Sequence, residues 1–507
     1  MLPWHRLPLF IYLLAGSGAV MLVTSVLGYM LDDHDSARPF FYGAWLTFFL
    51  CALFGLALAN RRGRVTARSH LLTLMGAYLV LPVWLMLPLI AVVPTLTPMV
   101  AYFEAISALT TTGATVFDRP ESVPVTVHLY RGLVAWSGGF LILLAAVAIM
   151  LPLNIGGFEV QAVITGRKRA TARNHLAMAD AGERLSRAAS IVAPVYVTLT
   201  AALMILLMLM GQGPVKAGMT AMAVLSTSGI LPVSNVSAAG GSAGAEIAMA
   251  LFLLIGATAI VYDPRRRMSV EQVGRDPELR LLIAICLILP GALFLRHWIG
   301  ALELDGSGQS VNQVVLAIRA AWGALFTVLS FLTTFGLESA YWDDAQRWSG
   351  LPTPGILLMG LSMIGGGVAT TAGGVKLLRI YALYRHGERE LRRLTLPHSV
   401  GGAGATARRI RTQGAFIAWI FLMLFLATLA VTMLALTAAG LPFEEALRAG
   451  TASLTNTGPG YLILHDAPRR YADFAPVVHM ILAGAMVLGR LETLALIALL
   501  NPGFWRS

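Results

Sequence analysis

Long apolar stretches separated by short polar segments run along the whole chain. Most approach or exceed the ~20 residues that an α-helix needs to cross a bilayer. The stretches cover about residues 8–30, 40–60, 70–94, 127–153, 188–211, 244–262, 279–300, 351–384, 413–440 and 472–500. A membrane β-barrel would instead show alternating segments of about 10 residues. The pattern predicts an all-α integral membrane protein with about ten spans, the eighth interrupted by glycine.

A short polar run that ends in glycine occurs four times between these stretches. The runs are Thr110-Thr111-Thr112-Gly113, Ser226-Thr227-Ser228-Gly229, Thr333-Thr334-Phe335-Gly336 and Thr455-Asn456-Thr457-Gly458. Leucine precedes every run, and the residue three positions before each run is serine or alanine. One such run would be an ordinary turn. Because four copies share this context, we interpret them as equivalent parts of an internal repeat.

Each polar run follows a short segment such as Met99–Leu109 or Glu444–Leu454. A segment of about ten residues is too short to span a bilayer, so we expect a re-entrant helix. The predicted unit is helix, re-entrant pore helix, polar turn and helix, repeated four times around one pore. The expected division is an accessory helix pair at 1–66, then pore repeats at 67–178, 179–276, 277–405 and 406–507.

Composition agrees with a membrane protein, because 57% of the residues are hydrophobic and only 12% are charged, against about 25% charged in soluble domains. The net charge of +11 comes largely from arginines in alternate loops, for example Arg61, Arg167, Arg265 and Arg385. The opposite loops are richer in acidic residues. By the positive-inside rule, the arginine-rich loops and both termini are cytoplasmic. Nucleic-acid binding would need an aromatic or motif signature that the sequence lacks.

The four polar turns have the chemistry of an ion filter. Non-helical backbone at membrane depth is tolerated where it lines a wet cavity, and a ring of carbonyl oxygens can replace the hydration shell of potassium. Glycine permits the positive φ angles that turn carbonyls toward a pore. The expected ligands, mainly through backbone carbonyls, are Thr111, Thr112, Gly113, Thr227, Ser228, Gly229, Thr334, Phe335, Gly336, Asn456, Thr457 and Gly458.

The eighth apolar stretch contains five glycines between Gly365 and Lys376. Each glycine weakens a helix by about 1 kcal/mol relative to alanine, so we expect an unwound loop inside the membrane. Close glycine-mediated packing of two helices is the alternative. Arg490 lies near the middle of the last apolar stretch, where a charge is costly and marks a functional candidate. Lys376 is either a second such group or a lysine that reaches the cytoplasmic surface.

Two segments carry a resemblance to a known family. Phe103–Thr115 and Ser453–Gly460 resemble the first and fourth filters of the Trk/Ktr/HKT superfamily of potassium transporters, most closely the membrane subunit of bacterial Trk systems. Trp136–Gly139 and Ile155–Gly157 resemble landmarks that follow the first filter, and the two extra N-terminal helices match the Trk branch. The resemblance covers essentially the whole chain. It implies potassium uptake across the bacterial inner membrane.

In that family a glycine in each filter goes with potassium selectivity, and serine in place of the first admits sodium. The four glycines therefore imply potassium as the transported ion, although Phe335 departs from the usual polar residue and implies looser selectivity. The family also has a glycine-rich barrier beneath the filter, next to an arginine. The implied gate residues are Gly365, Gly366, Gly367, Thr370, Thr371, Gly373, Gly374, Lys376 and Arg490. Our hypothesis is that Arg490 blocks ions when the gate is shut.

Members of this family resemble one another in working as homodimers on a cytoplasmic ring that binds nucleotides. The sequence contains no glycine-rich or Walker nucleotide motif, so we expect no cofactor on this chain and regulation by another one. A secondary transporter coupled to sodium or protons stays open as the alternative function. A membrane-embedded enzyme would need clustered acidic residues or histidines. The histidines are scattered instead, and we expect no enzyme.

Overall fold

The computed structural model describes residues 8–58, 67–151, 181–233, 242–258, 276–301, 310–350, 354–395, 414–463 and 469–491. Within these ranges every regular element is a helix. Eight of the described helices are long and apolar enough to cross a membrane. They lie at Leu9–Met30, His34–Leu58, Leu71–Val92, Val125–Met150, Arg184–Leu209, Pro277–Arg296, Val314–Leu332 and Ala415–Ala438. The chain is therefore a multi-pass, all-α membrane protein, as the sequence predicts.

The first part of the chain forms a helix hairpin followed by one re-entrant unit. The elements are α1 (Leu9–Met30), α2 (His34–Leu58), α3 (Ala67–Val92), α4 (Pro98–Leu109) and α5 (Val125–Ala145), which continues through a π-helical turn at Ala146–Met150. The hairpin is fastened to the unit where the Thr126 hydroxyl donates to Asp33 at 2.6 Å. This contact places the α1–α2 turn beside the segment that follows the first polar run.

The later units use the same order of elements. They are α9 (Ala181–Leu209), α10 (Pro214–Ser226) and α11 (Ala243–Gly256); then α13 (Pro277–Ala301), α14 (Ser310–Leu332), α15 (Trp342–Ser349), α16 (Pro354–Ile364) and α17 (Leu377–Thr395); then α19 (Ala415–Ala438), α20 (Phe443–Leu454), α21 (Gly460–Ile463) and α22 (Pro476–Leu491). Proline begins or directly precedes α4, α10 and α20, where its missing amide costs no hydrogen bond.

The structure differs from the sequence prediction in the third unit. The helix before the third polar run, α14, is a 23-residue helix, whereas the other three re-entrant helices have 12 or 13 residues. The predicted interruption of the eighth span is confirmed, because α16 ends at Ile364 and α17 begins at Leu377. The segment between them is not helical. The alternative of two tightly packed continuous helices is therefore wrong.

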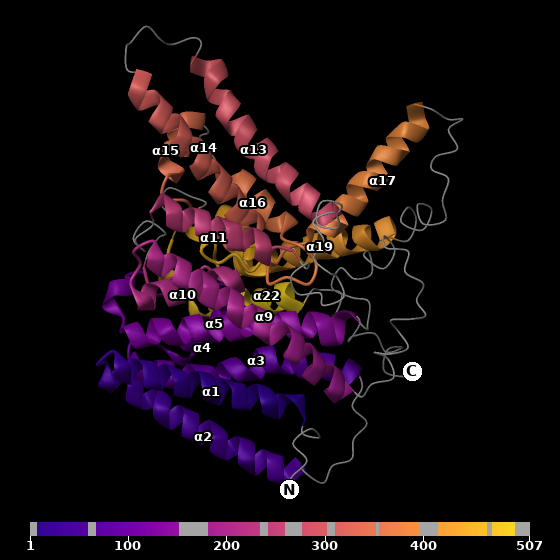
Figure 1. Cartoon of the computed structure of the whole chain (residues 1–507). Coiled ribbons are helices and arrows are strands. Elements are labelled where there is room, and N and C mark those ends of the chain that lie inside the picture. The colour runs from indigo at the N-terminus through magenta and orange to yellow at the C-terminus, as the bar shows by residue number, and fades with distance from the viewer. Residues whose placement is uncertain are drawn as a thin grey trace.

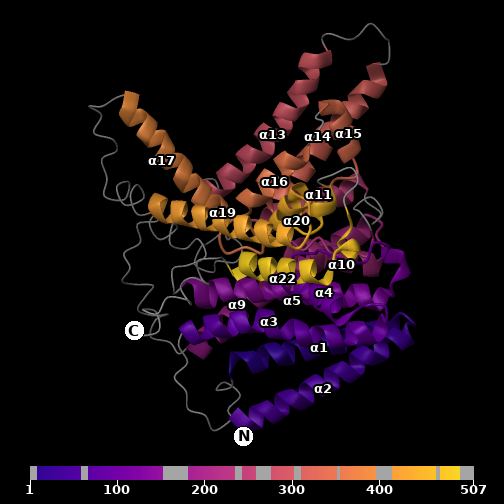
Figure 2. The ribbon, with the colours of Figure 1, turned by 180° about the vertical axis from the view of Figure 1, so that it is seen from behind.

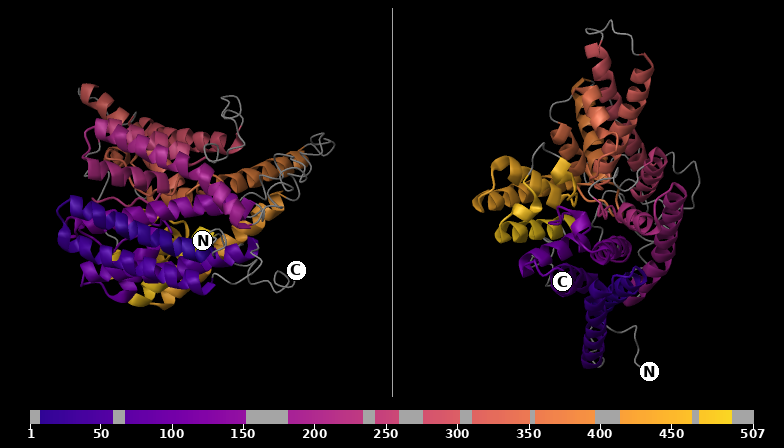
Figure 3. Two further views of the ribbon diagram at one scale, coloured as in Figure 1. Left: turned by 60° about the horizontal axis from the view of Figure 1, so that its bottom comes forward. Right: turned by 90° about the vertical axis from the view of Figure 1, so that its left-hand side faces the viewer.

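The units succeed one another around a common centre. Viewed along the helices, the colours pass from purple through magenta and orange to yellow around the molecule, with the indigo hairpin outside (Figure 3, right). Figure 1 shows α13 and α14 on one side of the bundle and α17 projecting from it. In Figure 2, α22 lies deep in the bundle, where it contacts α4 and α20. The last unit thus closes against the first.

Candidate ion filter and gate

The four polar runs meet in a closed ring. At each glycine a Cβ atom would collide with, or closely approach, the residue just before the glycine of the next run. These approaches run from Gly113 to Ser228, from Gly229 to Phe335, from Gly336 to Thr457 and from Gly458 to Thr112. For Gly113, Gly229 and Gly458 the atom approached is a carbonyl oxygen, at 2.5 Å for Gly229 and 2.7 Å for Gly458. The ring has no room for a side chain at any of its four glycines.

Each re-entrant helix ends in a Schellman motif, in which the residue after the helix cap has a positive φ. In the first copy the Thr112 amide donates to the Ser107 carbonyl at 2.8 Å, and the Thr111 amide donates to the Ala108 carbonyl at 2.9 Å. The other three copies repeat both bonds. Because the helix ends here, its partially negative carbonyl end faces the ring, which favours a cation.

The residue with positive φ is a threonine or asparagine in every copy. The φ values are 55° at Thr111, 51° at Thr227, 58° at Thr334 and 55° at Asn456. Threonine is a poor choice for this conformation, since β-branched residues rarely adopt it. Such strain gathers at functional sites. The sequence reasoning missed this position, because only Asn456 carries a residue type that favours a positive φ.

Three of the four glycines also have a positive φ, of 78° at Gly113, 62° at Gly229 and 76° at Gly336. Gly458 does not. Its amide donates instead to the carbonyl of Thr112 at 2.7 Å, across the boundary between the fourth and first copies. Gly458 therefore does not use the positive φ that glycine permits, and the absence of a Cβ there allows the close approach of the two turns.

Hydroxyl pairs brace three of the four turns. The first and third residues of the run bond to each other at 2.8 Å in the first copy (Thr110 with Thr112), and at 3.0 Å in the second and fourth copies. The third copy has Phe335 at this place, and its side chain is fully buried in an apolar core that includes residues of α10, α11 and α14. Its backbone nevertheless makes the same Schellman bonds, so the turn keeps its shape without the hydroxyl pair.

A buried carboxylate supports the segment that follows the first turn. Glu104, on α4, accepts from the Thr115 hydroxyl at 2.8 Å and from the Val116 amide at 2.5 Å. Its other oxygen lies 2.8 Å from Nε of Arg131 on α5. The Arg131 guanidinium also stacks on Phe117, 5.0 Å from the ring centre. Sequence reasoning missed this ion pair, although an acid within an apolar re-entrant segment is the signal that points to it.

Glu338 takes the place of Thr115 after the third turn, two residues beyond the glycine. Burial first, and the nearby carboxylate of Asp343 second, raise the pKa of Glu338 to about 7. The side chain is thus neutral in mild acid and ionised above neutrality.

The unwound segment 365–376 lies directly under the ring. The Gly373 amide donates to the Thr334 hydroxyl at 2.9 Å. The Thr371 hydroxyl lies 3.2 Å from the Thr227 hydroxyl and donates to the Leu225 carbonyl at 3.3 Å. A Cβ on Gly373 would collide with the Thr455 carbonyl. The segment therefore touches the second, third and fourth copies at their helix ends.

The two ends of this segment are tied together. The Val375 and Lys376 amides both donate at 2.9 Å, to the carbonyls of Met363 and Ile364. Gly365 and Gly374 have positive φ and pack face to face, so that a Cβ on Gly374 would lie 2.7 Å from the Cα of Gly365. Glycine is required here because the backbone crosses itself. The segment is therefore a loop that leaves the helix axis and returns to it, with its two ends in contact.

Two buried cations hold the carbonyls of the segment. Lys376 donates to the Ala372 carbonyl, and Arg490 donates to the Thr371 carbonyl. Arg490 is 4% exposed, and the buried Tyr78 hydroxyl lies beside its guanidinium. Arg490 lines a cavity of about 20 Å³ together with Gly373, Lys376 and the π-helical turn of α5. That volume admits about one water molecule.

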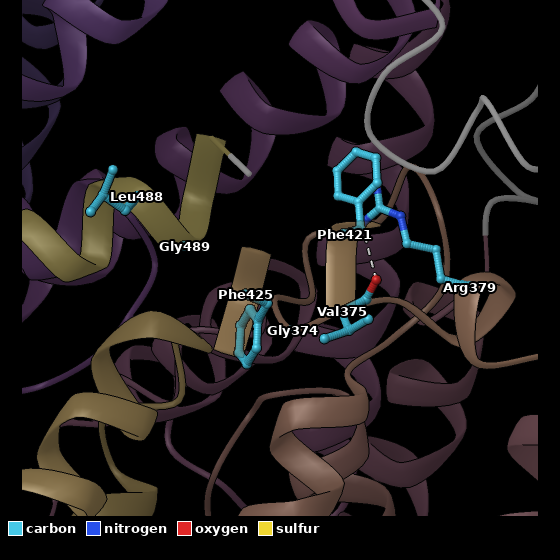
Figure 4. A pocket seen from close by; sticks show the side chains of 7 residues that line it. All are labelled: Gly374, Val375, Arg379, Phe421, Phe425, Leu488 and Gly489. Atoms are coloured by element: carbon cyan, nitrogen blue, oxygen red, sulfur yellow. Dashed lines mark hydrogen bonds between the residues drawn. The ribbon is translucent and has the colours of Figure 1, made fainter. Parts of the chain in front are cut away.

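A second cavity of about 20 Å³ lies behind the segment (Figure 4). Arg379 donates to the Val375 carbonyl at 3.0 Å and lies 3.5 Å from the centre of the Phe421 ring. Figure 4 shows Arg379, Phe421 and Val375 on one side of the cavity, and Leu488 and Gly489 of α22 on the other. Arg379 thus links the end of the segment to α19. The landmark Ile155–Gly157 lies outside the described residues.

Comparisons with known proteins agree with this architecture. The family described as "Cation transport protein" (TrkH) matches residues 275–502. The "Trk system potassium uptake protein TrkH" of Salmonella typhimurium is 31% identical over 468 residues, covering 91% of this chain and 92% of that protein. The protein of the same name from Vibrio parahaemolyticus is 29% identical and covers 98% of both chains.

A solved structure gives the same result. The crystal structure of the potassium transporter TrkH from Vibrio parahaemolyticus superposes with a TM-score of 0.77 at 28% identity, over 98% of each chain. Both the sequence and the fold are therefore shared over nearly the whole length. The chain belongs to the TrkH family of cation transport proteins.

Proposed function

We propose that this chain is the pore-forming subunit of a bacterial potassium uptake system and that K⁺ crosses the inner membrane through the ring of four turns. The observation that carries the proposal is the closed ring itself, in which every glycine abuts the residue before the next glycine. Four helix ends aim partial negative charge at it. Relatives that share almost the whole chain are named potassium uptake proteins, which supports K⁺ as the ion.

In this proposal the carbonyls of the ring replace the water around K⁺. The ions run down their electrochemical gradient, with the membrane potential contributing about 2.3 kcal/mol per charge per 100 mV. The acidic α1–α2 turn lies on the same side as the segments that follow the turns, since Asp33 accepts from Thr126. That side faces outward by the positive-inside rule, and both termini face the cytoplasm.

The segment 365–376 is the proposed gate. It contacts three of the four helix ends from below, carries Lys376, and accepts a hydrogen bond from Arg490 of α22. Two buried positive charges and a closed backbone oppose the passage of a cation. Opening requires the hydrogen bonds from Gly373, Thr371 and Arg490 to break. We further propose that a homodimer of this chain sits on a cytoplasmic nucleotide-binding ring that biases this step, and that the four pore repeats have the boundaries stated above.

Cation flux into liposomes that contain the purified protein tests the proposed function. Potassium flux much greater than sodium flux, with this preference lost in Gly113→Ser, supports the filter. The reason is that a Cβ at Gly113 would overlap the Ser228 carbonyl. Equal or absent flux of the two ions, also with the cytoplasmic partner present, favours the transporter coupled to sodium or protons.

The gate has its own test in the same liposomes. Arg490→Ala removes a buried charge and its bond to Thr371, so we expect potassium flux without the cytoplasmic partner to rise. Arg385→Ala is the matched control, because its side chain is 53% exposed and pairs with Glu388. Equal basal flux in both variants contradicts the role of Arg490 in the gate.

A further inference from the structure

In three of the four units, the fourth residue of the helix that follows the polar turn contacts a segment lying between a turn and the next helix. In α5, His128 lies 2.8 Å from the Pro120 carbonyl, and in α22, His479 lies 2.8 Å from the Tyr471 carbonyl. Both histidines act within their own unit. The fourth residue of α11 is Glu246. Glu246 differs from the two histidines in two ways. It is a carboxylate, and it contacts residues of the third unit instead of its own.

Glu246 accepts three hydrogen bonds and is completely buried. Its Oε2 accepts from Trp322 Nε1 at 2.9 Å and from the Ser339 hydroxyl at 2.7 Å, and its Oε1 accepts from the Ala340 amide at 2.6 Å. All three donors belong to the third unit. Within the described part of the chain no lysine or arginine pairs with this carboxylate, and neutral donors of the third unit satisfy both of its oxygens.

Glu246 is hydrogen-bonded to the segment that directly follows the third turn. Ser339 lies three residues beyond Gly336, and its amide also donates to the Thr327 hydroxyl at 3.2 Å. The third turn is the one that lacks a hydroxyl pair, because Phe335 occupies the third place of the run. The Phe335 carbonyl faces Gly229 of the second turn. Glu246 therefore fixes the chain a few residues after the Phe335 carbonyl. The third turn, which contains this carbonyl, lacks the hydroxyl pair of the other three turns.

We infer that Glu246 is a positioning residue for ion selectivity: a carboxylate of the second unit that holds Ser339 and Ala340 of the third, and so sets the place of the Phe335 carbonyl in the ring. It takes at the third turn the part that Glu104 takes at the first. The inference rests on the proposed function, since it concerns which ion the ring prefers.

Glu246→Gln tests the inference by potassium and sodium flux measured in parallel. A glutamine amide would place its own donors against the donors of the third unit, so the exit segment shifts. We expect the ratio of potassium to sodium flux to fall about fivefold or more, as for the loss of one buried hydrogen bond. Potassium flux itself persists. Glu444→Gln is the matched control, because that carboxylate is 77% exposed on α20.

Two further variants keep the test decisive if Glu246→Gln folds poorly. Ser339→Ala and Trp322→Phe each remove one donor and leave the carboxylate in place, and we expect a smaller fall of the ratio in each. A purely structural role would lower both fluxes together and leave their ratio unchanged, which overturns the inference. A wild-type protein that shows no preference for potassium overturns the proposed function and the inference with it. A selective wild type with unaltered variants overturns the inference alone.

Discussion

The first and third turns reach the same backbone shape with different side chains. The first turn has a hydroxyl pair, a short re-entrant helix and a carboxylate from its own unit, Glu104. The third has Phe335, the 23-residue helix α14 and a carboxylate borrowed from the second unit, Glu246. The Schellman bonds and positive φ angles are nevertheless shared. The backbone is thus the invariant part of the ring, and the side chains are interchangeable supports.

The largest expected effect comes from breaking the support of the first turn. Glu104→Ala leaves Arg131 buried without its partner, which costs about 3–5 kcal/mol. We expect a clearly lower temperature of thermal unfolding in detergent. Glu444→Ala, which removes the exposed partner of Arg448, serves as the control. Similar unfolding temperatures for the two variants would mean that the Glu104–Arg131 pair contributes little.

A second variant makes the third turn more like the first. Phe335→Thr supplies the missing hydroxyl next to Thr333 but empties part of the core, at a cost of about 3 kcal/mol. We expect a less stable protein whose potassium-to-sodium flux ratio is higher than that of the wild type. A ratio that falls would show that packing of the Phe335 ring, rather than the hydroxyl pair, fixes this turn.

The gate distinguishes the two turns as well. The Thr334 hydroxyl accepts from the Gly373 amide, whereas the buried Thr111 hydroxyl has no partner among the described residues. Thr334→Val should weaken the closed gate by about 1 kcal/mol and raise basal potassium flux about fivefold. Thr111→Val is the isosteric comparison and should raise it less. Equal basal potassium flux through both variants would contradict the proposal that the Gly373–Thr334 hydrogen bond holds the gate closed.

The smallest expected effect is a pH dependence that belongs to the third turn. Because the pKa of Glu338 is raised to about 7, this side chain is neutral at pH 6 and ionised at pH 8. An ionised carboxylate after the turn attracts cations, so potassium influx should rise about twofold to threefold across this range at low salt. Glu338→Gln should remove the step. A step that survives in this variant has another origin.

The sequence predicted the elements that depend on local pattern. Apolar length identified the described membrane helices except Val314–Leu332, which is absent from the predicted spans. The repeated runs ending in Gly113, Gly229, Gly336 and Gly458 marked the segments that the structure brings into one ring. Glycine density marked the unwound segment that begins at Gly365. Their roles as filter and gate stay predictions.

The sequence could not reveal contacts between distant residues. The hydrogen bond between Glu246 and Ala340 spans 94 positions. Glu246 stands out as an acid in an apolar stretch, but nothing in the sequence identifies its partner. The length of α14 was also missed, because its first turns around Ser310 follow a polar stretch that reads as a loop. The sequence predicts Thr111 and Thr334 as ion ligands. Both residues have a positive φ because they occupy the Schellman motif at the helix end. Threonine does not favour this conformation, so the sequence does not reveal it.

Replacing each ring glycine by serine, one at a time, tests the central claim most directly. The four variants are Gly113→Ser, Gly229→Ser, Gly336→Ser and Gly458→Ser, and the readout is the ratio of potassium to sodium flux in liposomes. If the four turns form one ring, every variant loses preference for potassium, because each added Cβ meets the neighbouring turn. Loss confined to one or two variants, with the others like the wild type, would contradict a four-part filter.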